Sequence, residues 1–66
     1  MLTQEEARKI LIDLKNNYGV SFTDIANETG ISKSHISAFI KEKTNMKKQK
    51  LDLIIKYIEK EIIKHG

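Results

Sequence analysis

Apolar residues in this 66-residue chain recur at spacings of three and four, and nowhere do they alternate at every second position over the length of a strand. Spacings of three and four place apolar side chains on one face of an α-helix. A short helix is only marginally stable in water and gains most of its stability by packing that face against a partner. The sequence therefore predicts an all-α fold of short helices around one core.

Residues that begin and end helices divide the chain into four segments. A capping box begins at Thr3, and Ser21 and Ser32 have the type and position of N-caps. Gly19 and Gly30 can adopt the left-handed conformation that ends a helix. We therefore expect helices at about residues 4–17, 22–28, 33–41 and 46–64.

The fourth segment has more apolar residues than one narrow stripe needs. Its predicted inward stripe consists of Leu51, Ile54, Ile55, Ile58 and Ile62. Leu53, Tyr57 and Ile63 fall outside that stripe. Two interpretations are open: these three residues close the core of a small domain, or they form a partner surface such as a dimer interface.

Length and composition exclude several classes of protein. A chain of this size forms one domain, here residues 1–66, and buries too little surface to hold a deep substrate cleft beside a core. It has no Cys, as suits a reducing cytosol, and no pattern of a signal peptide. Its apolar runs are too short to span a bilayer. We expect a soluble protein of the bacterial cytoplasm or of a phage-infected host cell, without a membrane partner.

Charge is distributed unevenly along the chain. The net charge of +3 divides into −2 over residues 1–32 and +5 over residues 33–66. Six lysines and a single acid lie between Lys33 and Lys50. A basic surface of this kind attracts a polyanion, although solvated lysines alone would give the same composition.

A helix-turn-helix pattern occupies about residues 22–41, with the sequence FTDIANETGISKSHISAFIK. Gly30 permits the tight turn, and Ala26 is small where the third helix crosses the second. The apolar anchors of the pair are Ile25, Ile31, Ile36 and Phe39. This segment resembles the helix-turn-helix of phage repressor and Cro-like (Xre-like) proteins. The resemblance implies a lambda-repressor-like domain of four short helices, or of five where a Gly-Val break, absent here, divides the last segment.

The resemblance also implies that the third helix enters the major groove of double-stranded DNA. The positions that match the base-facing sites of the family are Lys33, Ser34, Ser37 and Ala38. Lys33 can donate to guanine, and Ala38 can contact a thymine methyl group. The two serines can donate or accept hydrogen bonds, and their alternative role is plain solvation.

Phosphate contacts are expected around this helix. The candidates are Ser21, Thr23, Lys41, Lys43, Thr44, Asn45, Lys47 and Lys48. Lys47 and Lys48 are expected in the first helical turn, where the helix dipole disfavours each cation by about 0.3–1 kcal/mol. A bound phosphate would offset that cost. Ser21 is explained equally well as a helix cap.

No catalytic or metal-binding pattern is present. His35 and His65 lack further ligands at metal-binding spacing, and no nucleophile occurs with a base and an orienting group. We therefore expect no enzymatic activity, no cofactor, no metal and no small-molecule substrate.

These observations predict a sequence-specific DNA-binding transcriptional regulator of the phage or mobile-element repressor type. A dimer through the fourth helix would present two recognition helices to half-sites about 34 Å apart. The alternative is a protein-binding adaptor that keeps the helix-turn-helix scaffold and uses the fourth helix as its interface. RNA binding ranks third.

Overall fold

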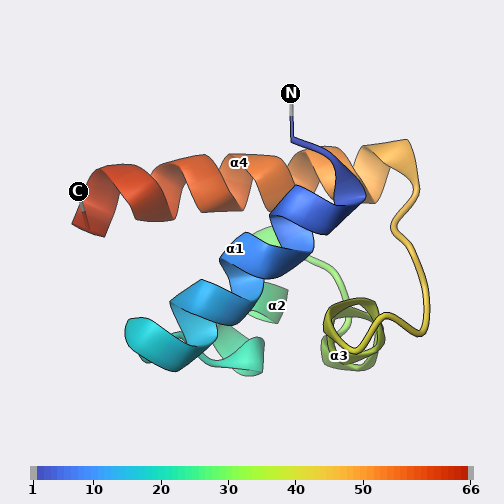
Figure 1. Cartoon of the computed structure of the whole chain (residues 1–66), viewed down its shortest axis with the longest axis horizontal. Helices are drawn as coiled ribbons and strands as arrows, with labels where there is room; N and C mark the ends of the chain where they lie inside the picture. Colours follow the sequence, from blue (N-terminus) through green and yellow to red (C-terminus); the bar gives the residue numbers. More distant parts are fainter. Residues whose placement is uncertain (1, 66) are drawn as a thin grey trace.

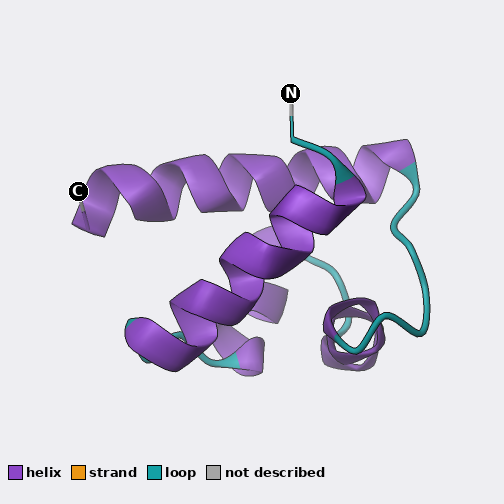
Figure 2. Ribbon diagram, viewed as in Figure 1, coloured by secondary structure: helices purple, strands orange, loops and turns teal. Residues whose placement is uncertain are grey.

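The computed structural model describes residues 2–65, with the side chains of residues 2–64. Over these residues the chain forms four α-helices and no strand (Figure 2). The helices are α1 (Gln4–Asn17), α2 (Phe22–Thr29), α3 (Lys33–Ile40) and α4 (Lys48–His65). The predicted all-α fold is confirmed, and α4 continues unbroken rather than dividing into a fourth and a fifth helix. The terminal residues of the predicted 1–66 domain and the His65 side chain lie outside the described part.

The helices are arranged so that α3 stands at one end of the molecule (Figure 1). The longest helix, α4, runs along one side, and α1 crosses it. On the other side α2 packs against α3, and α3 packs against α1. The segment after α3 returns to the start of α4 along the outside of the molecule (Figure 1). One long face of α3 is therefore left at the surface.

All four helices contribute to a single core. Phe39, Leu11, Ile25, Ile36, Ile54 and Ile58 are its largest fully buried side chains. Ala7, Leu14, Ile31, Met46 and Tyr57 complete it. The apolar anchors expected for the helix-turn-helix are thus all in the core.

The predicted caps are present at all three expected helix starts. Thr3 and Ser21 each form a complete capping box, and the Ser32 side chain accepts from the His35 backbone N–H. Gly19 has φ 68°, and Gly30 has φ 74° as the left-handed cap of α2.

Thr29 strengthens the turn between α2 and α3. Its buried hydroxyl donates to the Ile25 carbonyl at 2.7 Å and accepts from the Ile31 amide at 3.2 Å. The hydroxyl thereby satisfies backbone groups on both sides of the turn, a role that an aliphatic residue could not perform.

Arg8 is a buried charge that holds α3 and the following segment against α1. Its Nε donates to the Phe39 carbonyl at 2.6 Å, and one terminal nitrogen contacts Glu5 at 2.6 Å. The other terminal nitrogen donates to Asn45 Oδ1 at 3.0 Å and to the Thr44 carbonyl at 3.4 Å. The guanidinium also lies 4.6 Å from the centroid of the Phe39 ring. The planar fork of an arginine suits these divergent acceptors.

Gln4 makes a second connection between α1 and the segment after α3. Its amide donates to the Met46 carbonyl at 2.5 Å and accepts from the Met46 N–H at 3.1 Å. Met46 is buried, so this pair satisfies both backbone polar groups of a buried residue. Gln4 and Arg8 together hold residues 44–46, which lead into α4, against α1.

The inward face of α4 differs from the predicted one. Ile62 is 54% exposed and so does not belong to the inward stripe, whereas Glu61 and Tyr57 are buried. Tyr57 is 4% exposed and belongs to the core, so of the two interpretations the partner surface is wrong for this residue. The physical reason is that α1 and α2 both pack against α4, so its buried face is wider than one apolar stripe. Leu53 and Ile63 are exposed. The helix also begins at Lys48, two residues later than expected.

Replacing Arg8 by methionine removes the donors to the Phe39 and Thr44 carbonyls while keeping an apolar stem of similar length. We expect the free energy of unfolding to fall by about 2 kcal/mol, because polar groups in the interior lose a charged partner. For a domain of this size that corresponds to a fall in melting temperature of roughly 10 °C. Thermal and urea unfolding measure it.

The matched control is Lys9→Met, which removes one positive charge from an exposed neighbouring position. This control should leave stability nearly unchanged. Equal unfolding curves for the Arg8→Met variant and the parent chain would contradict the role given to Arg8.

Candidate nucleic-acid interface

The outward face of α3 forms a shallow concavity of about 410 Å³ with neighbouring residues. We call it the α3 concavity; its lining is Phe22, Lys33, Ser34, Ser37, Ala38, Lys41 and Lys43. All four predicted base-facing residues are therefore brought together on one surface. Lys33 and Ser34 are exposed, whereas Ser37 and Ala38 are half-buried. The lining holds three ammonium groups and no carboxylate.

The position of these side chains follows from the helical repeat. Ile36 and Phe39 are fully buried and turn one side of α3 toward the core. With 3.6 residues per turn, Ser34, Ser37 and Lys41 then point to the opposite side. Small residues on that side leave the helix narrow where another surface can approach.

The chain leaves α3 through a left-handed turn at a residue that is not glycine. Glu42 has φ 62°. Its N–H donates to the Phe39 carbonyl at 3.1 Å, and the Lys43 N–H donates to the Ala38 carbonyl at 2.8 Å. This is the Schellman pattern, in which glycine is usual because a side chain there costs about 1–2 kcal/mol. The turn places Lys43 in the lining of the concavity.

Two of the predicted phosphate contacts have structural roles. The Thr44 carbonyl and the Asn45 side-chain oxygen both accept from Arg8. The Thr44 hydroxyl donates to the Asn45 carbonyl at 3.3 Å. These residues hold the segment between α3 and α4 in place.

The basic surface continues from this segment onto α4. Lys47 and Lys48 are exposed, and the Lys47 carbonyl accepts the first hydrogen bond of the helix, from Leu51, at 2.8 Å. No acid lies in the first turn of α4. Lys50 Nζ is 3.4 Å from His35 Nδ1, which joins this turn to the flank of α3.

At the start of α2, the structure separates the roles of the two hydroxyl residues. Ser21 is exposed, and its hydroxyl accepts from the Asp24 N–H at 3.1 Å as part of the capping box. Thr23, two residues after Ser21, is also exposed. Both flank Phe22, but neither lines the α3 concavity.

Two residues of this region were missed by sequence reasoning. Phe22 is half-buried and contributes the aromatic part of the concavity. Lys15 Nζ lies 5.2 Å from the centroid of the Phe22 ring. The available signal was an aromatic residue directly after the Ser21 cap, but its place in one lining with Ala38 depends on how α2 packs against α3.

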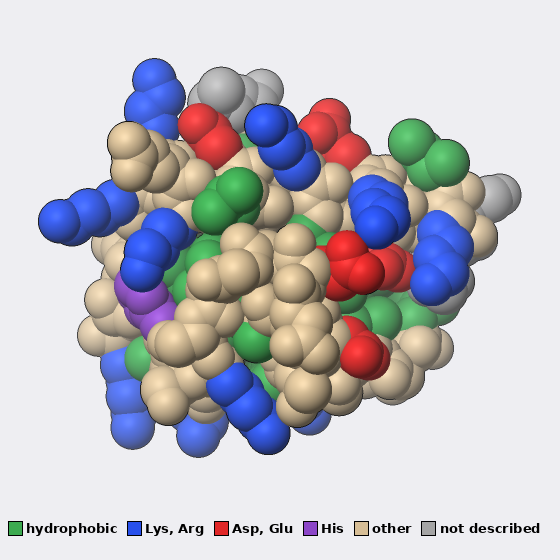
Figure 3. All heavy atoms as spheres, turned by 180° about the vertical axis from the view of Figure 1, so that it is seen from behind, with side chains coloured by type: hydrophobic (Ala, Val, Ile, Leu, Met, Phe, Trp, Pro, Cys, Tyr) green, Lys and Arg blue, Asp and Glu red, His purple; other side chains and the backbone are tan. Residues whose placement is uncertain are grey.

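Positive charge gathers on the side of the molecule that carries α3. In Figure 3, Lys and Arg side chains line the left and lower edges, next to α3 and the segment that follows it. The acidic side chains in that view lie at the top and in the right half, where further Lys and Arg side chains lie among them. One acid, Glu28 of α2, is engaged by Lys60 at 3.0 Å. The surface around α3 is therefore suited to an anion.

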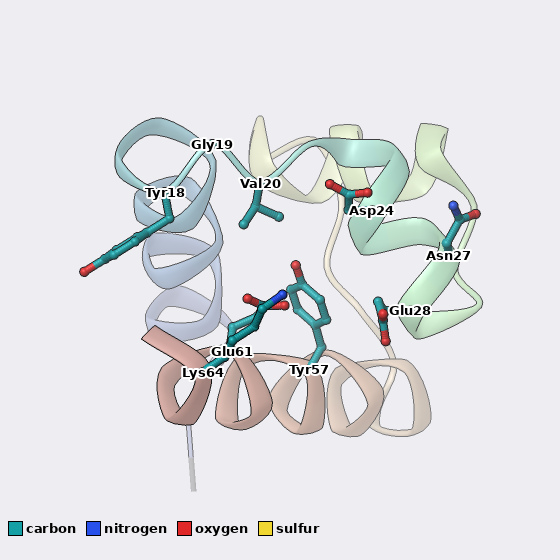
Figure 4. A pocket seen from close by; sticks show the side chains of 9 residues that line it. All are labelled: Tyr18, Gly19, Val20, Asp24, Asn27, Glu28, Tyr57, Glu61 and Lys64. Carbon is teal, nitrogen blue, oxygen red and sulfur yellow. The ribbon is translucent and has the colours of Figure 1, made fainter. Parts of the chain in front are cut away.

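A second hollow of about 400 Å³ has the opposite character (Figure 4). It lies between α2 and α4 and has the carboxylates of Asp24, Glu28 and Glu61 in its lining. Tyr57 projects into it from α4 (Figure 4). Burial, with the charges of Glu61, Asp24 and Glu28, raises the pKa of Tyr57 to about 12. Lys64 is the one basic residue among the described residues of the lining, so carboxylates outnumber ammonium groups there and the hollow suits phosphate poorly.

The raised pKa of Tyr57 predicts a loss of stability at high pH. The hydroxyl ionises near pH 10 in the unfolded chain and near pH 12 in the folded one, so the folded state favours the protonated form. This contribution is fully present below pH 10 and is lost as the pH rises toward 12. The full contribution is roughly 3 kcal/mol, of which roughly 2 kcal/mol should be lost between pH 9 and pH 11.5, and urea unfolding at these two pH values measures that loss.

Tyr57→Phe is the control, because it keeps the ring and removes the ionisable group. The variant should lose less stability than the parent chain between the two pH values. The same pH dependence in both proteins would contradict the assignment.

Among the described residues, no helix is both long enough and apolar enough to cross a bilayer. No group of three or more His, Cys, Asp or Glu side chains in that part of the chain is placed to hold a metal ion.

Comparison with known families finds a DNA-binding family. A model of winged helix-turn-helix DNA-binding domains matches residues 7–42, which is more than half of the chain. The matched stretch includes most of α1, all of α2 and α3, and the left-handed turn at Glu42. No curated protein and no solved structure matches the chain.

Proposed function

The chain belongs to the winged helix-turn-helix DNA-binding family, and we propose that it is a sequence-specific transcriptional regulator that inserts α3 into the major groove of double-stranded DNA. The observation that carries this proposal is the α3 concavity, where small and basic side chains lie together without a carboxylate. The major groove is about 12 Å wide and admits one helix. Proteins of this family are typically not enzymes, and we propose no catalytic role.

In this proposal the first residues of α3 read base edges. Lys33 donates to guanine acceptors, and the hydroxyls of Ser34 and Ser37 donate or accept. Lys41 and Lys43, at the other end of the concavity, contact the phosphates beside the groove. Lys33 and Ser34 lie at the start of α3, whereas Lys41 and Lys43 lie just beyond its end, and this placement supports the division of roles.

Further phosphate contacts come from Lys47 and Lys48, at the start of α4, and from Ser21 and Thr23, at the start of α2. The free N–H groups at the start of α4 add to the attraction for an anion. Arg8 and Gln4 hold the intervening segment rigidly, so little conformational entropy is lost when it meets the backbone of DNA.

We propose the phage repressor or Cro-like type for this regulator. Support comes from the all-helical path of residues 2–65, in which no β-hairpin wing follows α3. The region that follows α3 is instead a short basic segment and α4, which fits the lambda-repressor-like domain of short helices that the resemblance implies.

A second candidate function is protein binding through α4. It is favoured by Leu53, Ile62 and Ile63, which are apolar and exposed on that helix. In a regulator, Leu53 and Ile63 can instead form the interface of a homodimer. Operator half-sites about 34 Å apart, or a multiple of that, would then match the two copies of α3.

The salt dependence of DNA binding tests the phosphate contacts. With about 4 to 6 contacts, the logarithm of the binding constant should fall against the logarithm of salt concentration with a slope of roughly −4 to −5. Replacing Lys47 and Lys48 by Ala should reduce the steepness by about 2, since each contact contributes roughly 0.9. Fluorescence anisotropy with a labelled duplex measures both slopes.

The matched control replaces Lys56 and Lys64, which are exposed on α4, by Ala. It removes the same charge and should leave the slope almost unchanged. Equal effects of the two double variants would contradict the placement of the phosphates. No binding to a randomised duplex pool at low salt, together with a tight protein partner, would favour the second candidate function.

Ser34→Glu tests insertion of α3. The new carboxylate would face the bases and phosphates of the groove, so we expect affinity to fall by roughly a hundredfold or more. Ser34→Gln, of nearly the same shape without the charge, should retain most of the affinity for non-specific duplex DNA. Unchanged binding by the Ser34→Glu variant would show that α3 does not enter the groove.

A further inference from the structure

We propose that Phe22 and Ala38 form a socket for the 5-methyl group of a pyrimidine in the major groove. The inference rests on the DNA-binding function proposed above and deepens it by naming a chemical group that is read. It extends to Phe22 the thymine-methyl contact expected of Ala38, and it concerns the apolar part of the α3 concavity, which the hydrogen-bonding and phosphate roles do not use.

The first observation is where the two apolar residues lie. Phe22 comes from the first turn of α2 and Ala38 from the last turn of α3, and both line the α3 concavity. Their companions in the lining are three lysines and two serines. Both apolar side chains are half-buried, so each presents part of its surface to the concavity.

The second observation is how the Phe22 ring is held. It packs partly against the core and carries the Lys15 ammonium 5.2 Å from its centroid. A cation at this distance is attracted to the face of the ring, which favours one ring orientation. Because the ring is held in one orientation at a basic surface, it loses little conformational entropy when it makes an apolar contact there.

The chemistry of the major groove limits what that contact can be. Base edges in the groove present hydrogen-bond donors and acceptors, and the apolar group among them is the C5-methyl of thymine. Alanine and phenylalanine are among the side chains that contact this methyl. A 5-methylcytosine carries the same group at the same ring position. The shared ligand is therefore a 5-methylpyrimidine, whether thymine or methylated cytosine.

The experiment compares duplexes that differ only in this methyl group. One 20-base-pair probe alternates A and T, and its counterpart has deoxyuridine for every thymidine. A second pair alternates C and G, with either cytosine or 5-methylcytosine. We expect the methyl-bearing member of a pair to bind about fourfold more tightly, the ratio that burial of one methyl-sized apolar group gives.

Two variants connect the methyl effect with the socket. Phe22→Ala and Ala38→Ser should each bring the affinity ratio of the thymine and uracil duplexes close to one. Ala38→Ser adds a single hydroxyl group at a half-buried site. This variant therefore tests the socket even if the Phe22→Ala variant folds poorly. Lys43→Ala is the matched control, because it should weaken binding to both duplexes equally and keep their ratio.

The outcomes separate this inference from the function on which it rests. A methyl effect in the A·T pair alone, or in both pairs, supports the socket. The two results show whether the socket accepts thymine only or 5-methylcytosine as well. Binding of the parent chain to all four duplexes without a methyl effect overturns the socket and leaves DNA binding intact. Failure to bind any duplex overturns the proposed function itself. A methyl effect that persists in both socket variants assigns the methyl contact to other residues and also overturns the inference.

Discussion

The geometry of the candidate interface depends on one buried guanidinium. Arg8 of α1 is hydrogen-bonded to carbonyls at the end of α3 and in the following segment, and its plane lies over the Phe39 ring. Phe39 is the largest fully buried side chain, so the contact between Arg8 and its ring connects the core to the surface segment that Arg8 holds. A buried charge is stable only when its donors are satisfied, and here the acceptors belong to the segment that must be positioned.

Local stability is reduced where the proposed DNA contacts lie. Glu42 adopts a left-handed conformation that favours glycine, and Lys47 and Lys48 place positive charge at the start of a helix. Each feature opposes folding slightly. Conflicts of this kind are expected at functional sites, because the rest of the structure supplies the stability that they remove. The acidic hollow around Tyr57 lies outside this region, and its lining shares no residue with the α3 concavity.

Most of the fold and part of the interface could be predicted from the sequence. The caps at Thr3, Ser21 and Ser32 and the outward position of Ser34 follow from rules that act over three or four residues. The inward face of α4 could not be predicted in the same way. Tyr57 is buried and Ile62 exposed because two other helices pack against α4, and apolar spacing alone does not say from which directions they approach.

The sequence by itself determined four helices, a tight turn at Gly30, and a basic segment beside a narrow helix face. Only the tertiary structure decided that Arg8 would anchor that segment and that Phe22 would lie with Ala38 in one concavity. The reason is the range of the interactions. Helix caps and periodicity join residues that are neighbours in the chain, whereas Arg8 and Phe39 are 31 positions apart and meet only when α1 packs against α3.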